Sequence, residues 1–324
     1  MIKTAMFDAK SYDKPGFLKY AEGFGVELKF FETKLNADTA GLAGGFDAVT
    51  VFVNDDVSAE VINRLQAGGV RMVALRCAGF NNVDVKAAFG KLHVARVPAY
   101  SPHAVAEHAM ALLLTSVRHI HKAYVRTKDF NFSLNGLTGF DLYGKTVGVI
   151  GTGRIGRVFT DICRGFGMRV LAYDPYPSEG LDYVDLDRLL KESDVVSLHC
   201  PLSPDTRHMI NAAAVERMKK GVVIINTSRG ALIDTEALLK GIKSEKIGAA
   251  CLDVYEEEAE FFFEDNSGHI MKDDVLARLL SMPNVLITSH QAFLTEEALN
   301  SIAYTTLENI SVFFNAGQTQ NQVI

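Results

Sequence analysis

The chain has little of what marks several classes of protein. Cysteine occurs at only four of 324 positions, and no two cysteines form a C-x-x-C pair, so neither a zinc site nor a disulfide framework is predicted. No uncharged apolar run approaches the roughly 20 residues that span a bilayer. Asp8 and Lys10 interrupt the N-terminus before a signal-type apolar core forms. We therefore expect a cytoplasmic protein with no membrane span.

The chain also lacks a basic excess. It contains 33 Lys and Arg against 39 Asp and Glu, a net charge of −6, whereas nucleic-acid-binding proteins normally carry basic clusters. No nucleic-acid partner is expected. The composition is that of a globular protein, 48% hydrophobic and 22% charged. At about 150 residues per domain, the length predicts two domains.

Strand-like and helix-like segments alternate along most of the sequence. Apolar, β-branched runs of strand length occur at 49–53, 70–75, 147–150, 170–173, 195–198, 222–226 and 285–288. Segments with helical spacing lie between them at 58–66, 157–166, 186–190 and 235–242. This alternation is typical of α/β proteins in which helices cover both faces of a doubly wound parallel sheet.

Two longer helical segments suggest the domain boundaries. Residues 101–128 are predicted to form one long helix that begins at Ser-Pro. Residues 295–314 are predicted to form another, with Thr295 as N-cap and two glutamates in the first turn. We expect a discontinuous first domain, residues 1–99 plus 296–324, and a second domain, residues 100–295.

A glycine motif in the second domain predicts a dinucleotide site. Gly151, Gly153 and Gly156 form G-x-G-x-x-G between an apolar strand and a helix, and Asp174 ends the following strand. These glycines permit a tight turn, close approach of the backbone to a pyrophosphate, and close packing of helix on strand. Asp174 would bind the ribose hydroxyls and repel a 2′-phosphate, so NAD is favoured over NADP. Arg154 is either a pyrophosphate contact or a solvated turn residue.

Three polar segments follow later strands, where open α/β sheets bind ligands. They are 226–231 (NTSRGA), 253–258 (DVYEEE) and 288–293 (TSHQAF). Taken singly, the Arg could equally be a surface ion-pair partner. The Glu residues could be a solvated acidic turn, and the His a structural histidine. Behind an intact nucleotide motif, they instead suggest groups that hold a substrate and move a proton.

In these segments, and in 76–84, 98–102, 143–145 and 199–202, the sequence resembles the NAD-dependent D-isomer-specific 2-hydroxyacid dehydrogenases. Within that family it is most similar to the D-lactate dehydrogenases of fermenting bacteria. The resemblance covers essentially the whole chain. It implies two Rossmann- or flavodoxin-like domains with an active site in the cleft between them, and reversible reduction of pyruvate to D-lactate by NADH.

The resemblance assigns the chemistry to three residues. Arg229 would bind the substrate carboxylate through a bidentate fork that lysine cannot reproduce. His290 would be the general acid and base, and Glu258 would orient it and favour its charged form. Residue chemistry alone does not choose among Glu256, Glu257 and Glu258; the family pattern D-V-Y-E-x-E selects the last.

Further site residues come from the same resemblance. Ala78 and Gly79 would offer backbone N–H groups to the carboxylate. Tyr100 and Phe293 would wall the substrate pocket, or else be ordinary core aromatics. The remaining NAD contacts would be Ile155, Cys200, Pro201, Thr206, Thr227, Ser228, Arg229 and Asp253. His199 is expected to be structural. No metal is expected, because the histidines of segment 101–128 have no carboxylate in a metal-binding motif.

Several alternatives stay open. A D-2-hydroxyisocaproate or phenyllactate dehydrogenase differs only in a few pocket side chains, and one methylene is worth only about 1–3 kcal/mol of discrimination. A non-enzymatic NAD-sensing corepressor needs no general acid, although this sequence retains the Arg, Glu and His residues. D-Phosphoglycerate dehydrogenases often carry an extra domain, and a formate dehydrogenase would not place a glutamate beside the histidine. A homodimer or homotetramer is expected.

Overall fold

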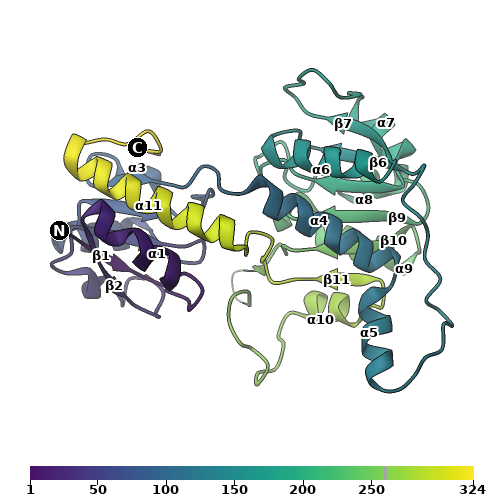
Figure 1. The fold of residues 1–324 in the computed structure, drawn as a ribbon, viewed down its shortest axis with the longest axis horizontal. Helices are drawn as coiled ribbons and strands as arrows, with labels where there is room; N and C mark the ends of the chain where they lie inside the picture. The colour runs from purple at the N-terminus through teal and green to yellow at the C-terminus, as the bar shows by residue number, and fades with distance from the viewer. Residues whose placement is uncertain (259–260) are drawn as a thin grey trace. The chain divides into compact units, whose positions relative to one another are not determined.

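The structure, a computed structural model, describes residues 1–258 and 261–324. The chain forms two compact units, residues 1–101 with 294–324, and residues 102–293. Each unit contains its own parallel β-sheet flanked by helices, as Figure 1 shows. The predicted α/β class with parallel sheets is confirmed.

The first unit is built on a five-stranded sheet in the order β2-β1-β3-β4-β5. The strands are β1 (Ile2–Met6), β2 (Val26–Phe30), β3 (Ala48–Val51), β4 (Met72–Leu75) and β5 (His93–Ala95). Its α-helices are α1 (Lys14–Ala21), α2 (Ala59–Ala67), α3 (Val85–Ala88) and α11 (Glu296–Ala316). Helix α11 packs against α1 (Figure 1). As predicted, the Thr295 hydroxyl caps α11 by accepting the Ala298 N–H at 3.2 Å.

The carboxyl ends of the first unit's strands are filled by a buried charged cluster. Arg76, only 2% exposed, follows β4, and its Nη1 lies 2.9 Å from Asp13 Oδ2. Its Nη2 donates to the Phe7 carbonyl at 2.8 Å, just after β1. Asp55, after β3, accepts the N–H groups of Leu35 and Phe52 at 2.6 Å each. Burial nevertheless raises the pKa of Asp55 to about 6.

The second unit is built on a six-stranded parallel sheet in the order β11-β10-β9-β8-β6-β7. The strands are β6 (Thr146–Ile150), β7 (Arg169–Tyr173), β8 (Val195–Leu198), β9 (Val222–Asn226), β10 (Ile247–Leu252) and β11 (Val285–Ile287). The helices are α4 (Pro102–Val117), α5 (Ile120–Lys128), α6 (Arg154–Gly165), α7 (Leu186–Glu192), α8 (Ala212–Arg217), α9 (Thr235–Lys243) and α10 (Asp274–Ser281).

Both faces of this sheet are buried. In β9, Val222 and Ile224 pack into the core beneath α7 to α10, whereas Val223 and Ile225 pack beneath α4 and α6. Alternate residues of a strand point to opposite faces, so a strand covered on both sides becomes continuously apolar. The apolar runs of the sequence therefore have a direct structural cause.

The prediction of one helix over residues 101–128 is wrong. Helix α4 ends at Val117 and α5 begins at Ile120, because His119 adopts a left-handed conformation with φ of +53°. The His119 ring nitrogen Nε2 lies 3.2 Å from the Thr138 carbonyl oxygen, which anchors the break. A single left-handed residue redirects the axis while leaving the spacing of apolar residues almost unchanged, so periodicity does not detect it.

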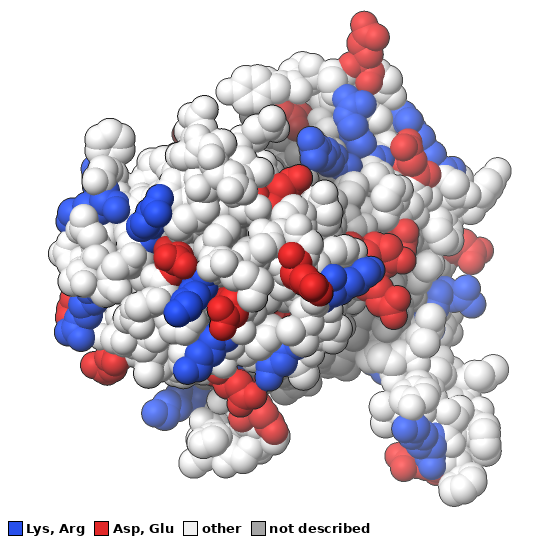
Figure 2. All heavy atoms as spheres, turned by 60° about the vertical axis from the view of Figure 1, so that its left-hand side comes forward, with Lys and Arg blue, Asp and Glu red and all other residues white. Residues whose placement is uncertain are grey.

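The remaining general features concern membranes, charge and thiols. No helix in the described part of the chain is long and apolar enough to cross a bilayer. On the face shown in Figure 2, basic and acidic side chains are interspersed. The four cysteines form no disulfide and are buried, and burial raises the pKa of Cys163 and Cys251 to about 12 and that of Cys200 to about 11.

Candidate active site

The glycine loop lies between β6 and α6, beside the end of β8. Gly151 has φ of +91°, and a Cβ there would lie 2.5 Å from the Cys200 backbone nitrogen. A Cβ on Gly156 would collide with the Gly151 carbonyl oxygen. Gly153, in contrast, has nothing within 4 Å of a hypothetical Cβ. Two glycines are therefore required by the fold itself, whereas the third leaves open space at the N-terminus of α6.

Asp174 is held beside this loop. Its Oδ2 accepts the Thr152 N–H at 2.7 Å and the Thr152 hydroxyl at 3.0 Å, and its Oδ1 accepts the Tyr176 N–H at 2.9 Å. Partial burial raises the pKa of this carboxyl, but the hydrogen bonds outweigh burial and the net shift is downward. Asp174 is therefore a fixed negative charge close to the open glycine.

These features fit a dinucleotide. Open space at Gly153 lets a pyrophosphate approach the helix N-terminus, where backbone N–H groups favour anions. The Thr227 hydroxyl, after β9, has no hydrogen-bond partner in the described part of the chain, so it is a polar group still to be satisfied. Arg154 is exposed at the first turn of α6, and Ile155 packs partly against the core.

A histidine–carboxylate pair occupies the carboxyl edge of the same sheet. His290 Nδ1, after β11, lies 2.8 Å from Glu258 Oε1, after β10. The other carboxylate oxygen of Glu258 accepts the Tyr255 N–H at 3.0 Å. The two side chains are 18% and 19% exposed. The imidazole is thus oriented through Nδ1, and its Nε2 is the ring atom available to a ligand.

The structure resolves which glutamate pairs with this histidine. Glu256 Oε1 lies 2.6 Å from His208 Nε2 and 3.1 Å from Arg207 Nη2, so that carboxylate is engaged elsewhere. Glu257 is exposed. The pairing predicted from the family pattern, between Glu258 and His290, is the one observed.

Arg229 follows β9 on the same edge of the sheet. Its Nη1 donates to the Ser228 carbonyl at 2.7 Å, and its own carbonyl accepts the Asn226 side-chain amide at 2.9 Å. Gly230 lets this turn pass close to the next segment, because a Cβ there would collide with the Tyr255 backbone. The guanidinium is half-buried and retains N–H donors for a carboxylate.

Asp253 organises the loop that carries His290. Its side chain is completely buried, and it accepts the N–H groups of Gln291 and Ala292 at 2.9 and 2.8 Å. Thr288 donates its hydroxyl to the same carboxylate at 2.5 Å. Burial raises the pKa of Asp253, but hydrogen bonds, first that from His108, outweigh burial and lower it. In this structure the Asp253 side chain fixes the loop and presents no surface.

The other predicted residues fall in several places. Cys200 and Pro201 follow β8, and the Thr206 hydroxyl donates back to the Pro201 carbonyl at 2.8 Å. Ser228 donates to the Cys200 carbonyl at 2.7 Å, which links the ends of β8 and β9. Phe293 is buried at the end of the second unit. Ala78, Gly79 and Tyr100 belong to the first unit, where Ala78 and Gly79 follow β4.

His199 is enclosed in the second unit. Burial lowers its pKa to about 3, its Nε2 lies 2.9 Å from the Ser197 hydroxyl oxygen, and its ring packs on Phe159 at 4.9 Å. It is a neutral, partly buried residue. Among the described residues, no group of three or more His, Cys, Asp or Glu is arranged to hold a metal ion.

Sequence reasoning missed two supporting residues. Thr152, an unspecified position of the glycine motif, fixes Asp174. His108 lies 3.1 Å from the Thr288 hydroxyl oxygen and 3.3 Å from Asp253 Oδ1. Its position at the helix face that packs on the sheet was the available signal, but spacing alone does not reveal a partner about 180 residues away.

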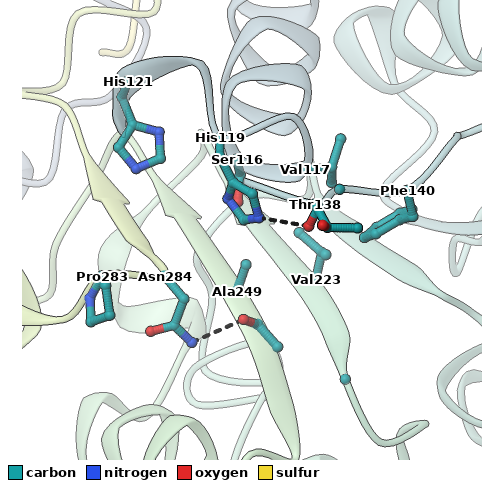
Figure 3. A pocket seen from close by; sticks show the side chains of 13 residues that line it. Ser116, Val117, His119, His121, Thr138, Phe140, Val223, Ala249, Pro283 and Asn284 are labelled. Atoms are coloured by element: carbon teal, nitrogen blue, oxygen red, sulfur yellow. Dashed lines mark hydrogen bonds between the residues drawn. The ribbon is translucent and has the colours of Figure 1, made fainter. Parts of the chain in front are cut away.

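A cavity of about 120 Å³ lies at the opposite, amino edge of this sheet. Figure 3 shows His119, His121 and Asn284 around it, with Asn284 donating to the Gly248 carbonyl. Its lining includes residues that precede β9 and β11. The cavity is therefore separate from the residues that follow the strands at the carboxyl edge.

Comparison with known proteins agrees with this geometry. Residues 110–292 match the family model of the D-isomer specific 2-hydroxyacid dehydrogenase, NAD binding domain. The chain is 54% identical to D-lactate dehydrogenase of Escherichia coli over 330 positions, covering 100% of both chains. The apo-structure of the E. coli enzyme superposes with a TM-score of 0.91 at 52% identity, covering 99% of this chain and 100% of that one.

A more distant structure, that of D-2-hydroxyisocaproate dehydrogenase, superposes with a TM-score of 0.88 at 35% identity, with 99% of each chain covered. The family match spans more than half of the sequence and coincides with the unit that holds the glycine loop and the histidine–glutamate pair. The chain belongs to the D-isomer-specific 2-hydroxyacid dehydrogenases and is an NAD-dependent oxidoreductase.

Proposed function

We propose that this protein reduces pyruvate to D-lactate with NADH, and that it catalyses the reverse reaction. The observation that carries the proposal is the His290–Glu258 pair at 2.8 Å on the carboxyl edge of the sheet. A relative that is 54% identical to this chain, from Escherichia coli, is named D-lactate dehydrogenase. The overall reaction is pyruvate plus NADH plus a proton giving D-lactate plus NAD.

The proton is supplied by His290. Because Nδ1 donates to Glu258, the protonated imidazole presents Nε2–H to the substrate carbonyl oxygen. Proton donation leaves a neutral imidazole with its hydrogen on Nδ1 and a lone pair on Nε2, which accepts the hydroxyl proton of lactate in the reverse direction. NADH, when bound, supplies the two electrons and hydrogen that the carbonyl carbon receives. Glu258 stabilises the charged imidazole before the transfer.

Arg229 holds the substrate carboxylate. A guanidinium presents planar N–H donors that match a carboxylate in a bidentate pair, and the Nη1 bond to Ser228 restricts its rotation. The carboxylate and carbonyl oxygen of pyruvate are then fixed by Arg229 and His290 together. With the nicotinamide on one side of the substrate, only one hand of product forms.

We propose that the glycine loop, Arg154, Ile155, Asp174 and the segments after β8, β9 and β10 form the NAD site. The charge of Asp174 disfavours a 2′-phosphate. Residues 100–295 would be the NAD-binding domain, and residues 1–99 with 296–324 the substrate-binding domain. Ala78 and Gly79 would bind the carboxylate through backbone N–H groups, and Tyr100 and Phe293 would limit substrate size.

We also propose a cytoplasmic homo-oligomer, a dimer or a tetramer. The segment from α5 onward exposes a run of large apolar side chains: Ile120, Tyr124, Val125, Phe130, Phe132 and Leu134. Phe130 and Leu134 are more than 80% exposed. Large apolar side chains exposed together in one segment favour a protein interface, and a second copy of the chain is the partner we expect.

The test is a steady-state assay of NADH oxidation with pyruvate, 2-ketoisocaproate and phenylpyruvate, followed by determination of the product's chirality. Pyruvate should give the highest kcat/KM, and the product should be D-lactate. A preference for a bulkier acid would favour the hydroxyisocaproate type of activity. Tight NADH binding without reduction of any 2-keto acid, or formation of L-lactate, would contradict the proposal.

The direction of pH dependence provides a second test. Reduction consumes the protonated form of His290, so its rate should fall as pH rises, whereas lactate oxidation requires the neutral form and should accelerate. Glu258→Gln should move both profiles to lower pH, because the amide no longer stabilises the imidazolium. Glu256→Gln is the matched control and should leave both profiles unchanged. Parallel profiles in the two directions would exclude His290 as the proton carrier.

A further inference from the structure

We propose that His108 is a positioning residue for the reaction: from helix α4 it holds, through Thr288 and Asp253, the loop that carries His290. The inference rests on the proposed role of His290. It assigns a function to a side chain that lies on a different element from the three proposed catalytic residues.

The contacts form a closed triangle. His108 Nε2 lies 3.1 Å from Thr288 Oγ1 and 3.3 Å from Asp253 Oδ1, and Thr288 Oγ1 lies 2.5 Å from the same Asp253 oxygen. The Asp253 side chain is completely buried, and that of His108 is 18% exposed. Helix α4, β10 and the end of β11 therefore meet in one hydrogen-bonded group.

The chemistry of the group fixes its protons. Hydrogen bonds hold the pKa of Asp253 below its ordinary value despite burial, so its carboxylate only accepts. The single hydroxyl hydrogen of Thr288 is used in the 2.5 Å bond to Asp253. The Thr288 oxygen must then accept from His108, which places a hydrogen on Nε2. His108 is thus a donor in both its neutral and its charged form.

The His290 loop depends on this carboxylate. Asp253 accepts the N–H groups of Gln291 and Ala292 through its side chain and that of His290, at 2.7 Å, through its carbonyl. His290 itself has φ of +54°, a conformation that a residue other than glycine keeps only when its surroundings enforce it. Loss of the His108 donor leaves a buried carboxylate short of a partner, and the loop can then shift to satisfy it.

The experiment compares three variants. His108→Leu removes the donor at similar volume, His108→Gln retains an N–H donor, and His103→Leu removes an exposed histidine from the same helix as a control. Because a displacement of about 1 Å can cost up to 100-fold in rate, we expect His108→Leu to lower kcat about 10- to 100-fold. The Kd for NADH should stay within about twofold. His108→Gln should recover most of the activity, and His103→Leu should match the wild type.

A double-mutant cycle tests whether His108 acts on the His290 loop through Thr288. If His108 acts through Thr288, the double variant His108→Leu/Thr288→Val should lose no more activity than the worse single variant. Multiplicative losses, an unchanged kcat in His108→Leu, or failure of His108→Gln to recover activity would overturn the proposal. The cycle and the Gln variant keep the test decisive even if His108→Leu lowers Tm.

A readout independent of turnover separates this proposal from the proposed function. In 15N-histidine-labelled protein, the ring signals of His290, assigned by their loss in His290→Ala, should shift or broaden in His108→Leu but not in His103→Leu. If the wild type reduced no 2-keto acid, the proposed function would fail alone. Unchanged His290 signals in His108→Leu would overturn the positioning role.

Discussion

The two sheets share a strand order, but the point where that order reverses is open in one unit and filled by side chains in the other. In each unit the second strand lies outside the first, and the third, fourth and fifth follow on the other side. The chain order therefore reverses between β1 and β3 in one unit and between β6 and β8 in the other. In the second unit this switch point holds a glycine loop with open space at Gly153. In the first it is filled by Arg76, Asp13 and Asp55.

The difference shows that topology provides a crevice and side chains decide its use. Open α/β sheets bind ligands outside the carboxyl ends of their strands at such a point. Bulky, buried ion-paired groups occupy that position in the first unit, so it cannot accept a pyrophosphate there. Glycines leave it available in the second. Substitutions in each unit test this contrast.

Removing the imidazole should damage only the chemistry of the second unit. His290→Ala should lower kcat for pyruvate reduction by about 10²–10⁴-fold, the usual contribution of a positioned acid–base group. The Kd for NADH, measured by fluorescence titration, should change little. His269→Ala, at an exposed histidine of the same unit, is the control and should retain wild-type turnover.

Breaking the buried ion pair should damage only the stability of the first unit. Arg76→Met leaves Asp13 buried without its cation, and such losses typically cost about 3–5 kcal/mol in the free energy of unfolding. Denaturant titration measures the effect. Arg64→Met, which removes an exposed partner of Glu60 in the same unit, should cost about 0.5 kcal/mol. Equal losses of stability in the two variants would show that the buried cluster does not stabilise the first unit.

The same cluster should respond to pH. The pKa of Asp55 is about 6 in the folded chain against 3.8 in the unfolded chain, so between these values the folded protein retains a proton that the unfolded chain has lost. Stability due to this group therefore falls as pH rises from about 4 to 6. Over that range the stability of Asp55→Asn relative to the wild type should rise, by up to roughly 3 kcal/mol. A pH-independent difference would contradict the assignment.

Filling the open glycine should affect cofactor binding alone. Gly153 has an ordinary negative φ of −65°, and a side chain there meets no protein atom within 4 Å. Gly153→Val should therefore keep Tm but weaken NADH binding about 10- to 100-fold, or about 1.4–2.8 kcal/mol. Gly23→Val, at an equally open position of the first unit, should leave NADH binding unchanged. If Gly153→Val bound NADH normally, the proposal that the pyrophosphate binds at this loop would be wrong.

Much of the second unit could be predicted from the sequence because its strands are buried on both faces and its glycines have steric causes. β6 is buried throughout, and its apolar run is unmistakable. The first unit was harder to read. β1 contains Lys3 and the fully buried Thr4, and β2 alternates with charged residues, so neither gives a continuous apolar run.

In the site, too, some features could be predicted from the sequence and others could not. The pairing of Glu258 with His290 was predicted by resemblance to a family, because the spacing of three adjacent glutamates carries no information about which one bonds a histidine 32 residues away. The triangle of His108, Asp253 and Thr288 was not predicted, since it depends on three elements meeting in space. The break between α4 and α5 depends on one dihedral angle of His119 and does not change the spacing of apolar residues along the sequence.

The deep burial of the thiols has a practical consequence. Thiolates, rather than thiols, react with peroxides, disulfides and alkylating reagents, and at neutral pH the raised pKa values of Cys163, Cys200 and Cys251 leave almost no thiolate. These three thiols should therefore resist oxidising buffers and alkylating agents in the native enzyme. Alkylation of these three thiols would then occur only on chains that have opened, so the extent of their labelling over time would report unfolding while the assay proceeds.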